Sequence, residues 1–170
     1  MSGMTHLYTG NGKGKTTAAL GLAIRAAGAG KKVFIGQFVK GMYYSEMEAL
    51  KRFPEIDLFQ FGLDCFIVNK PTQKDIDAAK TGLAETEMAM ASSEYDMYIL
   101  DEVCIAIHYD LFTVEELKNV LFSKPENAEL ILTGRYATDE LYEMADLITE
   151  MNEVKHYFNN GIQARIGIEF

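Results

Sequence analysis

Near its N-terminus the chain runs Met4-Thr5-His6-Leu7-Tyr8-Thr9-Gly10-Asn11-Gly12-Lys13-Gly14-Lys15-Thr16-Thr17. A short apolar run suited to a β-strand leads into three alternating glycines, and a helical segment rich in Ala and Leu follows over residues 18–29. In such a strand–loop–helix unit the backbone N–H groups of the loop and the N-terminus of the helix face phosphate oxygens. The stretch therefore predicts a phosphate loop that binds a nucleoside triphosphate.

Two side chains of this loop have predictable roles. Lys15 offers positive charge to the phosphates, and the hydroxyl of Thr16 is placed to bind Mg²⁺. The usual pattern G-x-x-x-x-G-K-[ST] would put its first glycine at Thr9, so the strict pattern fails by one residue. The dinucleotide fingerprint G-x-G-x-x-G is not matched either, because the three glycines alternate too evenly. A glycine turn without a ligand is the alternative, and the strand-to-helix context disfavours it. The predicted nucleotide-binding residues of the loop are Gly10, Asn11, Gly12, Lys13, Gly14, Lys15, Thr16 and Thr17.

Length and charge limit the possible functions. The 170 residues fit one nucleotide-binding domain over residues 1–170, and a net charge of −9 argues against nonspecific binding of nucleic acid. The chain contains no run of about 18 apolar residues, so no membrane span is expected. The N-terminus lacks the basic and apolar regions of a signal peptide, which predicts a cytoplasmic protein with reduced Cys65 and Cys104.

Apolar runs alternate with helical patterns along the rest of the chain. Strands are predicted at 33–38, 57–61, 97–100, 129–133 and 147–150, with a final strand or hairpin over 163–170. Helices are predicted at 72–91, 114–122 and 138–144, the second opened by a Thr113–Glu116 capping box. This alternation predicts an α/β fold of the P-loop NTPase type (RecA-like), with a mostly parallel sheet flanked by helices on both faces. Ligands of such sheets bind beyond the carboxyl ends of the strands.

An acidic pair, Asp101-Glu102, follows the apolar strand Met97–Leu100. Carboxylates at that position suit a Mg²⁺-triphosphate site opposite Thr16, because Mg²⁺ takes oxygen ligands directly or through water. Which of the two acids binds the metal directly is left open by the residues alone. Further positive charge could come from Lys13, Arg25, Lys40 and Arg135. The guanidinium of Arg135 could act as a bidentate phosphate donor.

Taken together, these motifs resemble the ATP:corrinoid adenosyltransferases that carry a phosphate loop. The resemblance covers nearly the whole chain and joins the loop to Gln37-Phe38-Val39-Lys40-Gly41, Ile99-Leu100-Asp101-Glu102, Leu132-Thr133-Gly134-Arg135, Ala145-Asp146-Leu147-Ile148-Thr149-Glu150-Met151, Val154-Lys155-His156, Gly161-Ile162-Gln163-Ala164 and Gly167-Ile168-Glu169-Phe170. It implies transfer of the 5′-deoxyadenosyl group of ATP to the Co(I) centre of a reduced corrinoid, with release of triphosphate. No Ser-His or Cys-His nucleophile is found, and Co(I) needs none.

The resemblance also implies roles for single residues. Lys15, Arg135 and Lys13 would neutralise the leaving triphosphate, Arg25 would contact phosphates, and Glu102 would hold Mg²⁺ (or Mn²⁺) together with Thr16 and Asp101. A reduced flavoprotein as electron donor and a homodimer are implied as partners, with no nucleic acid or membrane. The sequence starts almost at the first predicted strand, so we expect no counterpart of the N-terminal extension that helps cover the active site in some relatives.

One departure concerns the corrinoid. Relatives carry a Gly-Phe-Thr-Trp-like segment near it, whereas this chain has Cys65-Phe66-Ile67-Val68 and no Trp. Phe66 is the candidate corrinoid contact. Cobyrinic acid a,c-diamide, cobinamide and cobalamin all stay open as substrates. Two other functions also stay open, an ATP hydrolase or switch with a protein partner, for which Gln37 could position water, and a small-molecule kinase.

Overall fold

The computed structural model describes residues 2–63 and 70–170. Its elements in chain order are β1 (Thr5–Thr9), α1 (Lys15–Gly28), β2 (Val33–Phe38), α2 (Ser45–Leu50), β3 (Ile56–Phe61), α3 (Gln73–Ser92), β4 (Met97–Asp101), α4 (Val103–His108), α5 (Val114–Leu121), β5 (Glu129–Thr133), α6 (Asp139–Met144), β6 (Leu147–Glu150) and the 3₁₀ helix η1 (Tyr157–Asn160). Residue 1 and residues 64–69 are not described further. Cys65, which was predicted to be reduced, and Phe66, the candidate corrinoid contact, therefore lie outside the described residues.

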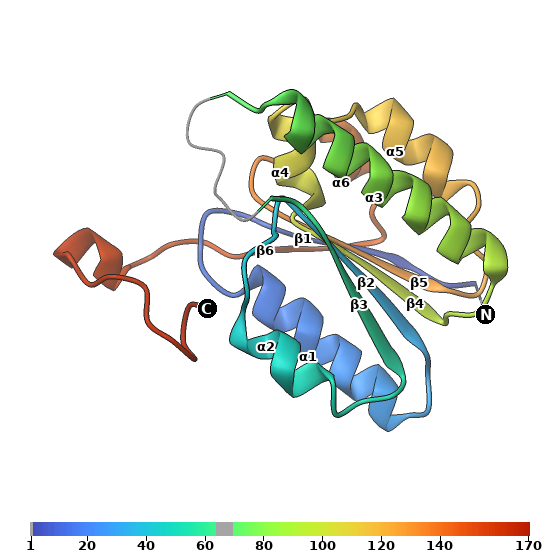
Figure 1. The fold of residues 1–170 in the computed structure, drawn as a ribbon, viewed down its shortest axis with the longest axis horizontal. Coiled ribbons are helices and arrows are strands. Elements are labelled where there is room, and N and C mark those ends of the chain that lie inside the picture. Colours follow the sequence, from blue (N-terminus) through green and yellow to red (C-terminus); the bar gives the residue numbers. More distant parts are fainter. Residues whose placement is uncertain (1, 64–69) are drawn as a thin grey trace.

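The six strands form one sheet in the order β3-β2-β4-β5-β1-β6, and every neighbouring pair is parallel (Figure 1). All carboxyl ends therefore meet at one edge of the sheet. The register places Gln37 of β2 opposite Asp101 of β4, and Tyr8 of β1 opposite Thr133 of β5. The predicted parallel α/β fold is confirmed, and the loops after β1, β2, β4 and β5 lie at the same edge.

Helices cover both faces of the sheet. Helices α1 and α2 lie on one face, and α3, α4, α5 and α6 lie on the other (Figure 1). On the first face Ala19, Ala23 and Ala27 of α1 pack against buried strand residues, and these small side chains let the helix approach the sheet closely. On the second face large residues such as Phe38 and Tyr98 fill the layer. Among the described residues no helix is both long and apolar enough to cross a membrane.

Local signals in the sequence explain where two helices begin. The hydroxyl of Thr113 accepts from the backbone N–H of Glu116, and the Glu116 carboxylate accepts from the backbone N–H of Thr113. This is the predicted capping box. Thr72 and Asp75 form a second box at the start of α3. Both helices therefore start at the predicted threonines.

The C-terminal prediction is wrong. Residues 163–170 contain a turn at 166–169 instead of a strand or hairpin. Ile166, Ile168 and Phe170 alternate as in a strand, but they are exposed, since this segment has left the sheet after β6. It runs outward with η1 and returns toward α2 and the loop after β1 (Figure 1). The short helices α2 and α4 were not predicted.

Candidate nucleotide-binding site

The loop between β1 and α1 has the backbone that its glycines predict. Gly10 and Gly14 take φ values of 93° and 119°, which favour glycine. A Cβ on Gly10 or Gly12 would come within 2.6 Å of the carbonyl oxygen of Met151, which also accepts a 2.6 Å hydrogen bond from the N–H of Gly12. The segment after β6 therefore packs against the loop and fixes its shape. Because Met151 approaches so closely, residues larger than glycine do not fit at positions 10 and 12.

Lys15 lies folded across this loop and is almost fully buried. Its ammonium donates 2.7 Å hydrogen bonds to the carbonyl oxygens of Gly10 and Gly12. Burial lowers the pKa of Lys15, and the negative charge of Glu102 partly opposes this shift. The side chain thus reaches the centre of the predicted phosphate site, where the helix α1 begins.

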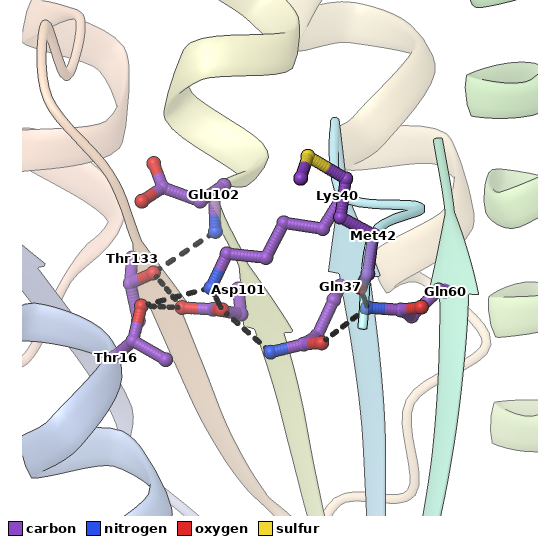
Figure 2. Close-up of polar contacts among 8 residues, drawn as sticks. All are labelled: Thr16, Gln37, Lys40, Met42, Gln60, Asp101, Glu102 and Thr133. Atoms are coloured by element: carbon purple, nitrogen blue, oxygen red, sulfur yellow. Dashed lines mark hydrogen bonds and ion pairs between the residues drawn. The ribbon is translucent and has the colours of Figure 1, made fainter. Parts of the chain in front are cut away.

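Asp101 is the centre of the polar network at the ends of β2, β4 and β5 (Figure 2). One carboxylate oxygen accepts from the hydroxyls of Thr16 at 2.9 Å and Thr133 at 2.7 Å. The other accepts from the amide of Gln37 at 3.2 Å and the ammonium of Lys40 at 2.8 Å. Asp101 is fully buried, so these donors replace the water that its charge would otherwise require. The carboxylate is therefore saturated with protein donors.

Glu102 adopts a left-handed conformation with φ 59° at the start of α4. Its backbone N–H donates to the hydroxyl of Thr133, while its carboxylate points away from Asp101 (Figure 2). Within the described part of the chain no hydrogen bond engages that carboxylate. Burial, followed by the charge of Asp101, raises the pKa of Glu102. Of the two acids predicted as metal ligands, Glu102 is the one with oxygen atoms available to a cation.

Lys40 is only one of several candidate cations in the sequence, yet its ammonium lies directly against the centre of this network. Its ammonium lies 2.8 Å from Asp101 and 3.3 Å from the hydroxyl of Thr16 (Figure 2). Burial would lower the pKa of Lys40, but the charge and hydrogen bond of Asp101 outweigh it, so the pKa is raised. No local sequence signal marks this contact, because Lys40 and Asp101 come together only through the pairing of β2 with β4 in the sheet.

Some of the other predicted site residues lie near the phosphate loop, and others do not. Asn11 and Thr17 are exposed at the loop, and exposed Arg135 follows β5 at the same sheet edge. Lys13 is exposed and donates a 2.8 Å hydrogen bond to the carbonyl oxygen of Ile168. Arg25 lies in the last turn of α1, about 15 Å along the helix from Lys15. The structure does not bring Arg25 to the phosphate loop, and Phe66 lies outside the described residues.

Similarity to known proteins agrees with this geometry. The family model for "ATP:corrinoid adenosyltransferase BtuR/CobO/CobP" matches residues 1–170. The corrinoid adenosyltransferase of Escherichia coli K12 is 36% identical over 170 residues, covering 99% of this chain and 86% of that protein. Corrinoid adenosyltransferase CobA of Salmonella typhimurium LT2 is 32% identical over 168 residues, covering 99% and 86%. The Pseudomonas aeruginosa relative is 34% identical, covering 99% and 84%.

The fold has a solved counterpart as well. A KaiC-like protein from Pyrococcus horikoshii superimposes with a TM-score of 0.58 over 91% of this chain and 74% of that one, at 18% identity. At that identity the likeness supports the P-loop NTPase fold alone. The family model and the sequence relatives together confirm the resemblance seen in the motifs, and the chain belongs to the ATP:corrinoid adenosyltransferase family.

Proposed function

We propose that this member of the family transfers the 5′-deoxyadenosyl group of ATP to the Co(I) centre of a reduced corrinoid. In this reaction the Co(I) electron pair attacks C5′, a cobalt–carbon bond forms, and the C5′–O bond breaks to release triphosphate. The protein must hold C5′ near cobalt and neutralise the charge that develops on the leaving group. Lys15, Lys13 and Arg135 are the cations that we assign to this task.

The hydrogen bonding of Asp101 is the observation that carries this proposal. A kinase needs a group that accepts a proton from the substrate, and a hydrolase needs a group that positions water. Both oxygens of Asp101 are bound by protein donors. Gln37 is equally committed, because its amide donates to Asp101 and its oxygen accepts from Gln60 at 3.2 Å. The carboxylate of Glu102, which no donor among the described residues engages, is assigned to the metal below. A Co(I) nucleophile requires neither a base nor a positioned water, so it fits this arrangement.

The residues at the site fit a divalent cation. Among residues 2–63 and 70–170 no three His, Cys, Asp or Glu side chains gather in a group that could hold a metal ion. The metal would therefore share its ligands between protein and triphosphate, as Mg²⁺ usually does. We assign Thr16 and Glu102 as its protein contacts and Asp101 as the acceptor that orients Thr16. Bound Mg²⁺ or Mn²⁺ would supply charge neutralisation on the triphosphate oxygens.

The loop after β2 is our candidate for the corrinoid-facing surface. Met42 and Tyr43 lie beyond the carboxyl end of β2 and are 41% and 63% exposed. Large apolar side chains in solvent next to a predicted active site suit a broad, partly apolar ligand. Phe66 stays a prediction for the same ligand.

A homodimer is part of the proposal, with the C-terminal segment as its interface. Val154, Phe158 and Ile166 are 96%, 62% and 80% exposed, and such apolar exposure is typical of a contact surface. A mass measured by light scattering on a size-exclusion column tests the dimer. A reduced flavoprotein as electron donor is proposed from the family resemblance alone.

The decisive experiment is anaerobic incubation with MgATP and chemically reduced Co(I) cobalamin. We expect loss of the Co(I) absorbance, a light-sensitive alkyl-corrinoid and an equal amount of triphosphate. The variant Lys15→Ala should abolish both products, whereas Lys31→Ala should not, because Lys31 is exposed before β2 at the opposite edge of the sheet. ADP and phosphate in place of triphosphate would overturn the proposal in favour of a hydrolase. If neither product forms, cobinamide is the next substrate to test.

A further inference from the structure

The backbone of Lys40 is held in place by close contact between two loops. Val39, directly after β2, has a φ of 59°, and Gly41 and Gly62 pack with almost no space between their backbones. A Cβ on Gly62 would lie 2.4 Å from the N atom of Lys40, and a Cβ on Gly41 would lie 2.5 Å from the carbonyl oxygen of Gly62. The position from which the Lys40 side chain starts is therefore fixed.

From this position the side chain extends across the ends of β2 and β4 (Figure 2). Its ammonium contacts Asp101 and Thr16, lies 5.1 Å from the centre of the Tyr44 ring, and the side chain is only 12% exposed. A buried ammonium is stable only with such partners. Thr16 is also a proposed contact of the metal, and the buried negative charge of Asp101 would attract that metal as it attracts the ammonium.

A lysine ammonium and a divalent cation cannot both lie beside the Thr16 hydroxyl and the Asp101 carboxylate at the same time. Mg²⁺ binds oxygen at about 2.0–2.1 Å, directly or through its own waters. An ammonium 3.3 Å from Thr16 occupies the space on that side of the hydroxyl, and its charge repels a second cation. A divalent ion bound by Thr16 therefore requires that Lys40 move away.

We propose that Lys40 is an internal counter-ion that occupies the cation position between Thr16 and Asp101 until a metal–triphosphate complex displaces it. This inference rests on the proposed function of the same site. Without a triphosphate, the protein offers too few oxygen ligands to compete with the covalently tethered ammonium. With a triphosphate, the additional oxygens of the nucleotide bind the metal, and the released ammonium gains phosphate as a new partner. Lys40 thus makes metal binding depend on the nucleotide.

The test measures Mn²⁺ binding to the nucleotide-free protein by electron paramagnetic resonance, with neither ATP nor corrinoid present. Lys40→Met should bind Mn²⁺ at least tenfold more tightly than the unmodified protein. Asp101→Asn in the Lys40→Met background should remove that gain. The control Lys51→Met should match the unmodified protein, because Lys51 pairs with Glu48 on the exposed surface.

Equal Mn²⁺ affinity in folded Lys40→Met and in the unmodified protein would overturn the proposal. If Lys40→Met does not fold, Lys40→Gln gives the same test, since its amide can still donate to Asp101 without a charge. Because no reaction is involved, this result is independent of the product assay. The proposed displacement of Lys40 by the metal can prove wrong while triphosphate is released in the product assay. It can also prove right even if the product is ADP.

Discussion

The ammonium of Lys13 lies 2.8 Å from the carbonyl oxygen of Ile168, so the phosphate loop is bonded to the last residues of the chain. Glu169 adds a weaker ion pair at 3.9 Å. Nearby, the hydroxyl of Ser45 at the start of α2 donates to the carbonyl oxygen of Phe170. The C-terminal segment therefore bridges the loop after β1 and α2. Since Lys13 is also assigned to the triphosphate, the segment and the nucleotide compete for one ammonium.

Removing residues 167–170 should tighten ATP binding. The truncated chain loses the acceptor that holds Lys13, and a hydrogen bond to a charged group contributes about 1.5 kcal/mol, which corresponds to roughly tenfold in affinity. Calorimetric titration with MgATP measures this change. The gain should vanish when Lys13→Met is combined with the truncation. Weaker ATP binding after truncation would show instead that these residues belong to the nucleotide site.

Glu102→Gln should stabilise the protein while reducing adenosyl transfer. The Glu102 carboxylate is partly buried beside the negative charge of Asp101, so the neutral amide removes a repulsion. We expect a gain on the order of 1 kcal/mol in the free energy of unfolding at pH 7, measured by urea denaturation. The same variant loses a proposed metal ligand, and its rate should fall at least a hundredfold. A less stable Glu102→Gln protein would contradict this reading of the site.

The stability gain of Glu102→Gln should depend on pH in one direction. The folded-state pKa of Glu102 is raised, so the folded protein binds a proton more tightly there than the unfolded chain does. The unmodified protein therefore loses stability as pH rises from about 4.3, the pKa of an unperturbed Glu, through the raised folded value. The variant lacks this loss. The difference between the two proteins should be near zero below pH 4 and should grow toward neutral pH in urea titrations.

Thr133→Val should damage the acidic site without changing the shape of the strand. The hydroxyl of Thr133 donates to Asp101 and accepts from the backbone N–H of Glu102, and valine has neither function. The cost should be about 1–3 kcal/mol of unfolding free energy, because two buried polar groups lose a partner. The control Thr149→Val on exposed β6 should stay within about 0.5 kcal/mol. Equal effects of the two variants in urea denaturation would rule out this role for Thr133.

The sequence predicts the parts of this molecule whose signals are local. The phosphate loop, the six strands of the sheet and the Thr113–Glu116 capping box each depend on a few adjacent residues, and the structure contains them all. Helix α4 was missed because Val103-Cys104-Ile105-Ala106-Ile107 is as apolar and β-branched as a buried strand. The segment 163–170 was misassigned because its alternating isoleucines imitate a strand that no neighbouring strand pairs with.

The network around Asp101 could not be predicted in the same way. Gln37 and Lys40 lie more than 60 positions before Asp101, and only the pairing of β2 with β4 brings them together. The sequence indicated an acid at the end of β4 but not which donors would saturate it. It also could not show that Arg25 lies far along the helix from the loop, since that depends on where α1 starts and how far it extends.

Gly62→Ala should disturb Lys40 through the backbone. The added methyl group would lie 2.4 Å from the N atom of Lys40, and neither of the two packed loops can move without breaking its contacts with Gly41. We expect a loss of about 1–3 kcal/mol in the free energy of unfolding. The matched control is Gly21→Ala in α1, where a Cβ meets nothing within 4 Å, and the substitution should stabilise the helix by about 0.5–1 kcal/mol. Because the shifted backbone should carry Lys40 away from Asp101, Gly62→Ala should also bind Mn²⁺ more tightly without nucleotide, as is expected of Lys40→Met. A destabilised Gly62→Ala protein with unchanged Mn²⁺ affinity would show that the ammonium keeps its place without this backbone contact.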